Sequence, residues 1–245
     1  MGEHKAGKTA AGKTAVGDAA LQAGQRAVKV WDLPVRLFHW LLVALFLFMF
    51  FSGKTKGNWM EWHMYAGYAI LALVLFRVLW GFAGSTHARF ASFLAGPGRS
   101  FAFARKLLSR EPAQVAGHNP LGGWMVVVLL GALLLQAGCG LFANDDISLE
   151  GPLSRLVSKE MSDRLTTIHY YNFYVLLGLA AVHVLAVLFH VFVKKENLVS
   201  AMFTGEKKLD AATEVPAARF ASSWLALTLL VLALAAVYLI VKRPF

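Results

Sequence analysis

The chain has 245 residues, of which 58% are hydrophobic and 16% are charged, and its mean hydropathy is +0.56. Soluble domains carry about 25% charged residues, so this composition excludes a soluble globular protein and indicates an integral membrane protein. The net charge of +10 does not require a nucleic acid as partner, because basic loops beside membrane helices face anionic lipid.

The N-terminal segment is basic and of low complexity, and we expect a disordered cytoplasmic tail over residues 1–29. We expect no cleavable signal peptide, because residues 1–30 have no hydrophobic core. Residues 7–14, Gly-Lys-Thr-Ala-Ala-Gly-Lys-Thr, match the P-loop pattern of nucleotide-binding proteins. A P-loop works only between a strand and a helix, and this segment is flanked by Ala, Gly, Lys and Thr, so we expect no nucleotide site.

Five apolar segments are long enough to cross a hydrocarbon core of about 30 Å, which takes roughly 20 residues. They cover residues 35–52, 62–83, 121–142, 168–193 and 220–241. We expect the first helix to be short, because Arg36 and a turn at residues 31–34 interrupt its start. The predicted fold is an all-α integral membrane protein. Residues 30–205 form a four-helix transmembrane bundle, residues 206–219 a cytoplasmic linker, and residues 220–245 an additional, fifth transmembrane helix.

Lysine and arginine are distributed unevenly among the loops. The segment up to Arg36, the loop 84–120 and the loop 194–219 carry sixteen of the 24 basic residues. Segments 53–61 and 142–167 and the C-terminal end carry seven. The positive-inside rule therefore predicts a cytoplasmic N-terminus and a C-terminus on the outer side.

Four histidines lie near the edges of the apolar segments. His169 and His183 are fourteen residues apart in the fourth segment, which places them within about 40° of one helix face and about 21 Å apart along it. His39 and His63 lie in the first and second segments, so depth predicts His63 beside His169 on the outer side and His39 beside His183 on the inner side. Four imidazoles at two depths are what two non-covalent, bis-histidine b haems require. The alternative is that these histidines are hydrogen-bonded in the core or in a proton path.

Three further residues are candidates at the inner site. His190, seven residues past His183, shares its helix face and is either an alternative inner ligand or a free side chain near a quinone headgroup. Arg77 lies fourteen residues after His63, where a haem propionate would supply the anion that a buried guanidinium needs. The alternative for Arg77 is snorkelling to the lipid headgroups. Arg36 is a second candidate for a propionate or a lipid phosphate.

The remaining cysteine and histidines do not point to a further site. Cys139 is the single cysteine, between two glycines of the third apolar segment, so we expect no disulfide, no covalent haem attachment and no iron–sulfur cluster. His4, His87 and His118 fall outside the apolar segments, where we expect solvated surface positions.

Two loop segments have apolar residues at helical spacing and are predicted to be amphipathic helices at the membrane interface. On the outer side these residues are Leu153, Leu156, Val157, Met161 and Leu165. On the inner side they are Phe90, Phe93, Phe101, Phe103 and Leu107.

Several motifs occur in a fixed order along the chain. Residues 30–40 are Val-Trp-Asp-Leu-Pro-Val-Arg-Leu-Phe-His-Trp, followed by His-Met-Tyr-Ala-Gly-Tyr at 63–68 and Phe-Arg-Val-Leu-Trp-Gly-Phe at 76–82. His-Ala-Arg-Phe follows at 87–90 and His-Asn-Pro-Leu-Gly-Gly-Trp at 118–124. Over about residues 28–205 the chain resembles the bacterial cytochrome b561 family, which includes the b-type cytochrome subunits of nickel–iron hydrogenases.

The resemblance implies a four-helix, di-haem b cytochrome of the bacterial inner membrane that passes electrons between a redox partner and membrane quinone. It implies the haem ligands His39, His63, His169 and His183, and a quinone pocket near the inner haem, at His190 and Arg36. The fifth apolar segment departs from the family, whose members usually stop after four helices. It either covers the bundle or docks an accessory subunit.

The predicted function is that of an electron-transfer subunit of a respiratory chain rather than a stand-alone enzyme. Its periplasmic partner would be a redox protein such as a hydrogenase or a c-type cytochrome. Two axial imidazoles keep the iron six-coordinate and leave no open site for oxygen. The outer loop carries acidic residues that would steer a basic c-type cytochrome, although ordinary loop solvation explains them equally well: Asp145, Asp146, Glu150, Glu160 and Asp163.

Two other functions stay open. One is a self-contained superoxide:quinone oxidoreductase, which would be active without a partner protein. The other is a haem-free, proton-coupled transporter, which would need discontinuous helices and repeat symmetry.

Overall fold

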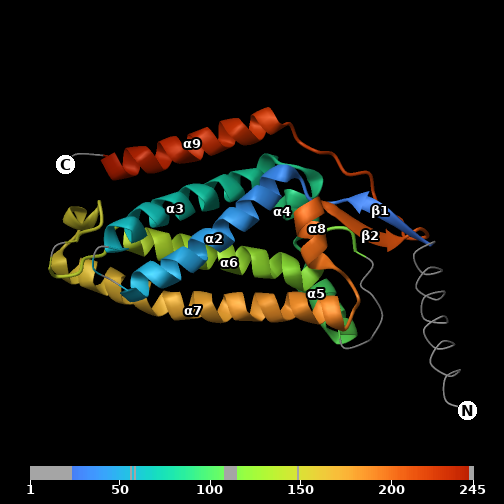
Figure 1. Ribbon diagram of the computed structural model, residues 1–245, viewed down its shortest axis with the longest axis horizontal. Coiled ribbons are helices and arrows are strands. Elements are labelled where there is room, and N and C mark those ends of the chain that lie inside the picture. The colour runs from blue at the N-terminus through green and yellow to red at the C-terminus, as the bar shows by residue number, and fades with distance from the viewer. Residues whose placement is uncertain (1–23, 56, 58, 108–114, 148, 243–245) are drawn as a thin grey trace, which may run out of the picture.

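The computed structural model describes residues 24–55, 57, 59–107, 115–147 and 149–242. Among these residues, five helices are long and apolar enough to cross a membrane: α2 (Leu33–Thr55), α3 (Trp59–Ala83), α6 (Pro120–Gly140), α7 (Lys159–Phe192) and α9 (Ser223–Lys242). Each corresponds to one of the five predicted segments, and Figure 1 shows them lying roughly lengthwise along one another. Most of the expected tail, including the P-loop-like residues 7–14, lies outside the described residues.

Helix α2 is longer than predicted. Asp32 precedes it, and the Oδ1 atom of Asp32 accepts a hydrogen bond of 2.8 Å from the backbone N–H of Val35. Pro34 is in the first turn, where a backbone N–H would have no helical partner in any case. The turn at residues 31–34 therefore starts the helix instead of shortening it, and α2 runs on to Thr55.

Helix α7 begins nine residues before the predicted segment. Its N-cap is Ser158, whose Oγ accepts a hydrogen bond of 3.2 Å from the N–H of Met161. Two ion pairs at i,i+4 spacing follow in the first turns, Lys159 with Asp163 and Glu160 with Arg164. The single amphipathic helix predicted over residues 153–165 is wrong. Residues Ser154–Leu156 form the short 3-10 helix η2, and Val157 is extended before α7 starts.

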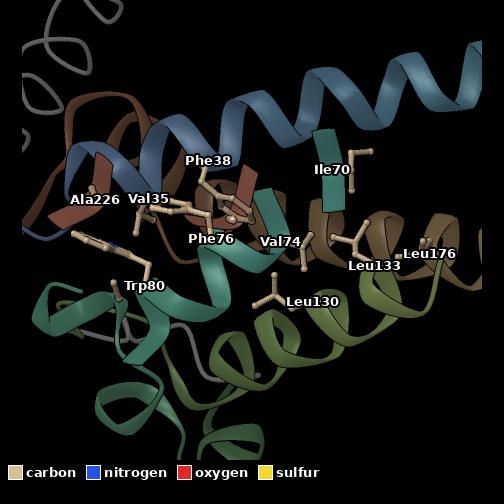
Figure 2. Packing of buried hydrophobic residues seen from close by; sticks show 12 residues of the cluster. Val35, Phe38, Ile70, Val74, Phe76, Trp80, Leu130, Leu133, Leu176 and Ala226 are labelled. Carbon is tan, nitrogen blue, oxygen red and sulfur yellow. The ribbon is translucent and has the colours of Figure 1, made fainter. Parts of the chain in front are cut away.

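Helix α3 is central to the packing, because it contacts α2, α6 and α9. Trp80 on α3 is completely buried, and its indole N–H donates to the Oδ2 atom of Asp32 over 3.0 Å. Figure 2 shows the surrounding cluster, to which α2, α6, α7 and α9 also contribute. Its labelled members are Val35, Phe38, Ile70, Val74, Phe76, Trp80, Leu130, Leu133, Leu176 and Ala226.

Helix α9 packs along α3 and buries one narrow face there, formed by Ala226, Ala233 and Val237. The segment before α9 is joined to the end of α3, since the N–H of Ala221 donates to the Oγ of Ser85 over 3.0 Å. Leu229, Leu230, Ile240 and Val241 are partly buried beside this face, and most other residues of α9 are exposed.

A two-stranded antiparallel sheet, which the sequence did not predict, lies at the end of the bundle where α2 begins (Figure 1). Strand β1 (Gln25–Lys29) falls within the expected tail, and strand β2 (Glu206–Asp210) falls within the expected linker. Leu209 and Lys207 are the two buried residues of β2. The Nζ of Lys207 donates to the carbonyl of Val115 over 2.7 Å, which satisfies its buried charge in part.

The same end of the bundle carries the short helices η1 (Thr86–Ala88), α4 (Phe90–Phe93), α5 (Pro97–Leu107) and α8 (Leu198–Thr204). The amphipathic segment predicted over residues 90–107 is thus helical, divided between α4 and α5.

Candidate functional site: two histidine pairs

The bundle brings four histidines together as two pairs. His63, near the start of α3, faces His169 on α7, with 6.4 Å between the ring centres and 72° between the ring planes. His39 on α2 faces His183 on α7, again with 6.4 Å between ring centres, at 56°. These are the two pairings expected from helix depth. Helix α7 contributes one ring to each pair, because residues fourteen apart return to the same helix face.

Hydrogen bonds fix the ring nitrogens of the first pair. The Nδ1 atom of His169 lies 2.8 Å from the carbonyl oxygen of Gln136, which can only accept, so Nδ1 carries the proton. The Nδ1 atom of His63 lies 3.0 Å from the Oγ of Ser52, which in turn donates to the carbonyl of Met49 over 3.4 Å. The Ser52 oxygen is thus left to accept from His63. In both rings Nε2 keeps its lone pair for a metal.

Glycines border both rings of this pair. A Cβ atom at Gly53 of α2 would lie 3.2 Å from the Cε1 atom of His63. A Cβ atom at Gly140 of α6 would lie 3.1 Å from the Cε1 atom of His169. Both distances are shorter than the ordinary carbon–carbon contact of about 3.5–4.0 Å. At these two positions the neighbouring helices lie too close to the rings to carry a side chain without a shift of the ring.

The second pair lies among buried nitrogen atoms that lack partners. The Nδ1 of His39, the Nη1 of Arg77 and the Nδ1 of His118 are buried and have no hydrogen-bond partner among the described residues. Arg77 is 3% exposed, and its guanidinium lies 5.6 Å from the centre of the Phe90 ring. Asp32 is near enough to stabilise the positive charge of Arg77. The Nη1 of Arg77 is a buried N–H donor without an acceptor among the described residues, which fits a further anion at this site.

The expectation that His118 is a solvated surface residue is wrong. Its ring centre lies 4.6 Å from that of Trp31 and 4.6 Å from that of Phe93. The pKa of His118 is lowered from 6.5 to about 3, first by burial and then by the positive charges of Arg77, His87 and His183. His118 is therefore neutral at physiological pH and belongs to the surroundings of the second pair.

His190 and Arg36 make other contacts. The Nδ1 of His190 lies 3.2 Å from a carboxylate oxygen of Glu196, and its Nε2 lies 3.4 Å from the side-chain nitrogen of Asn119. It is His183, and not His190, whose ring faces His39. The guanidinium of Arg36 donates to the carbonyl of Phe203 in α8, while its Nε is buried without a partner among the described residues.

Two surface pockets are present in the described part of the chain. One has a volume of about 260 Å³. It is lined by residues from the loops around His87 and His118 and by Glu214, Val215 and Pro216. The other, of about 210 Å³, lies between β1 and the segment 215–220 and contains Arg26 and Lys29. The lining residues of both pockets include none of the four paired histidines.

The pairs provide the geometry of two axial ligands. Two metal–imidazole bonds of about 2 Å, with roughly 1 Å from each nitrogen to its ring centre, place the ring centres about 6 Å apart. The observed separation of 6.4 Å fits this value at both sites. Two imidazoles leave the equatorial positions of a metal open, and a porphyrin fills these positions. The residues present therefore fit a haem held by two histidines.

Residues 30–205 match the model of the prokaryotic cytochrome b561 family. The chain belongs to that family. Relatives of this cytochrome include three proteins named probable Ni/Fe-hydrogenase B-type cytochrome subunits. The one from Rhizobium leguminosarum bv. viciae is 25% identical over 75% of this chain and 90% of the relative. The one from Azotobacter vinelandii is 27% identical over 74% and 88%. The one from Bradyrhizobium diazoefficiens is 23% identical over 78% and 92%. No solved structure matches the chain.

The cytochrome is thus a multi-pass membrane protein of the b type, with haem b as its family's cofactor and electron transfer as its function. The partners of the histidines were not found from the sequence. Ser52 and the Gln136 carbonyl lie on helices other than those of the rings they contact. The position of Ser52 within an apolar segment could have indicated a contact of this kind, since a buried hydroxyl needs a partner. A backbone carbonyl leaves no signal in the sequence.

Proposed function

We propose that this cytochrome carries electrons between a periplasmic redox partner and membrane quinone through two b haems, each held by one histidine pair. His63 and His169 would bind the outer haem, and His39 and His183 the inner haem. The two pairs at equal spacing in the two halves of one bundle support this proposal. The chain would lie in the bacterial inner membrane with a cytoplasmic N-terminus and a periplasmic C-terminus, as the basic residues of its loops predict.

A hydrogenase is the partner we favour, because the relatives carry the name of hydrogenase cytochrome subunits. The acidic outer loop is a weaker argument for a basic c-type cytochrome. Asp146 and Asp163 both pair with Lys159. Likewise Glu150 pairs with Arg155 and Glu160 with Arg164. Cations within the loop thus neutralise much of the charge that would steer a basic partner.

Bound haem supplies one-electron chemistry, and the chain's residues hold and orient it. The Nε2 atoms of the four histidines would hold the two iron atoms. Arg77 and Arg36 would hold propionates at the inner site, as their unpartnered buried nitrogens suggest. We place the quinone headgroup near the inner pair, where His190 and Arg36 lie. The hydrogen bond between His190 and Glu196 favours His183 as the inner ligand.

The first experiment is a pyridine haemochrome assay with a reduced-minus-oxidised spectrum on purified protein. We expect two b haems per chain in the unchanged protein and one in the His63→Ala variant, while His190→Ala keeps two. Absence of haem from a folded protein made in a haem-replete host would refute the proposal and favour a proton-coupled transporter. Superoxide oxidation coupled to quinone reduction, without any partner protein, would instead identify a self-contained oxidoreductase.

A further inference from the structure

Ser52 is a polar residue with no exposed surface, in the part of α2 that faces the start of α3. Its hydroxyl donates to the carbonyl of Met49 on its own helix and contacts the Nδ1 of His63 on α3 over 3.0 Å. The contact with His63 joins α2 to α3. Because the hydroxyl hydrogen of Ser52 is given to Met49, the Ser52 oxygen accepts from the N–H of the His63 ring.

Ser52 differs in this respect from the next hydroxyl on the same helix. The hydroxyl of Thr55 donates to the carbonyls of Phe51 and Ser52 over 3.0 Å and 3.4 Å, which is the usual way for a helix to satisfy such a group. Ser52 makes one bond of that kind and a second to a histidine of the proposed haem site. Its position is thus specific to the histidine, and Thr55 provides a matched control.

We propose that Ser52 is a positioning residue that fixes the ring of His63 and lowers the reduction potential of the His63–His169 site. The inference rests on the proposed haem ligation. A histidine that donates its second ring N–H to an acceptor is a stronger base toward the metal, and a more basic ligand stabilises the oxidised iron. Both rings of this pair donate in this way, His63 to Ser52 and His169 to the Gln136 carbonyl.

The surroundings of the His39–His183 site would raise its reduction potential. The Nδ1 of His39 is buried without a partner among the described residues, so no acceptor strengthens that ligand. The buried guanidinium of Arg77 belongs to these surroundings, because Arg77 and His183 both act electrostatically on His118. Its charge disfavours additional positive charge on an iron. One electron given up at the His63–His169 site would therefore be taken up at the His39–His183 site, with no bond or proton changed. The two sites would form a downhill step toward the inner side.

The test is a redox titration of purified Ser52→Ala, Thr55→Ala and unchanged cytochrome, each with its full haem content. The His63→Ala variant, which retains the other haem, assigns the two midpoint potentials. We expect Ser52→Ala to favour reduction at the His63–His169 site by roughly tenfold, an upward shift of about 59 mV for one electron. Its low-spin electron paramagnetic resonance signal should also change, because that signal responds to the angle between the imidazole planes. Thr55→Ala should change neither quantity.

Unchanged potentials and an unchanged resonance signal in Ser52→Ala would overturn the inference. That result would mean that Ser52 does not hold the His63 ring. An equal shift in Thr55→Ala, or a shift confined to the other haem, would overturn it as well. None of these results would affect the proposed function, which is tested separately by the haem content of the unchanged protein and of His63→Ala and by the assay for superoxide oxidation.

Discussion

Gly140→Ala is the substitution whose effect follows most directly from the geometry of the outer pair. A Cβ atom at this position would lie 3.1 Å from the Cε1 and 3.3 Å from the Nδ1 of His169. Ordinary carbon–carbon contacts begin near 3.5 Å, so the imidazole would have to retreat by roughly half an ångström. Its Nδ1 bonds the Gln136 carbonyl over 2.8 Å. A displaced ring weakens this bond, at a cost of about 1 kcal/mol, and misaligns Nε2.

Gly138→Ala is the matched control, because nothing lies within 4 Å of a Cβ atom at Gly138, two residues earlier on the same helix. Replacing glycine by alanine within a helix stabilises it by about 0.5–1 kcal/mol. We expect Gly138→Ala to keep or slightly raise the thermal midpoint with unchanged haem content. In Gly140→Ala the contact with His169 should cancel that gain and lower the haem content or alter its low-spin signal. Equal haem content, spectra and midpoints in the two variants would show that His169 does not depend on Gly140.

Three further outcomes follow from contacts at the other end of the bundle. Asp32→Ala should lower the free energy of unfolding by about 2–4 kcal/mol in a detergent-based denaturation assay, because it removes a helix cap and a carboxylate that stabilises the charge of Arg77. Asp32→Asn, which can still cap the helix, should cost less. His190→Ala should retain both haems but lower the thermal midpoint, since it leaves the buried carboxylate of Glu196 without one of its partners; loss of a haem would instead identify His190 as a ligand. For His118, whose folded pKa of about 3 lies below the ordinary 6.5, the unfolded chain binds more protons between these values. Stability should therefore fall with acidification below about pH 6, by at most about 1.4 kcal/mol per pH unit, and His118→Phe should flatten the slope; an equal slope in both proteins would refute this.

The transmembrane helices were predictable from the sequence because a bilayer demands long apolar segments with every backbone group bonded internally. Helix ends were less predictable. Hydropathy alone cannot find helical residues such as 159–167, where ion pairs and a serine cap extend α7 beyond the apolar segment. The strands were missed for a related reason. Strand β2 is Glu-Lys-Lys-Leu-Asp, which looks like a charged linker, and only its pairing with β1 makes it a strand.

The pairing of the histidines was predictable because two regular helices fix both depth and facing direction. Their immediate surroundings were not. His118 lies in a loop of small and polar residues, and its burial comes from Trp31 and Phe93, which approach from other parts of the chain. Helical periodicity reports which way a residue faces on its own helix. It does not report which backbone carbonyl or hydroxyl a neighbouring helix presents, and those groups decide how each ring is held.

The distribution of the four histidines couples haem binding to the assembly of the bundle. Helix α7 packs most closely on α6, and α2 packs on α3. Each histidine pair takes one ring from α7 and the other from α2 or α3. A haem bound at either site would therefore join α7 to the α2–α3 half, and its binding free energy would add to the stability of the folded bundle. The two sites differ in how strongly α7 is held without haem. His169 is also held by α6 through the Gln136 carbonyl, whereas no such hydrogen bond is seen for His183 within the described part of the chain. Loss of the His39–His183 haem should thus release the backbone of α7 around His183 more than loss of the other haem releases the backbone around His169. Hydrogen exchange along α7 would measure the difference.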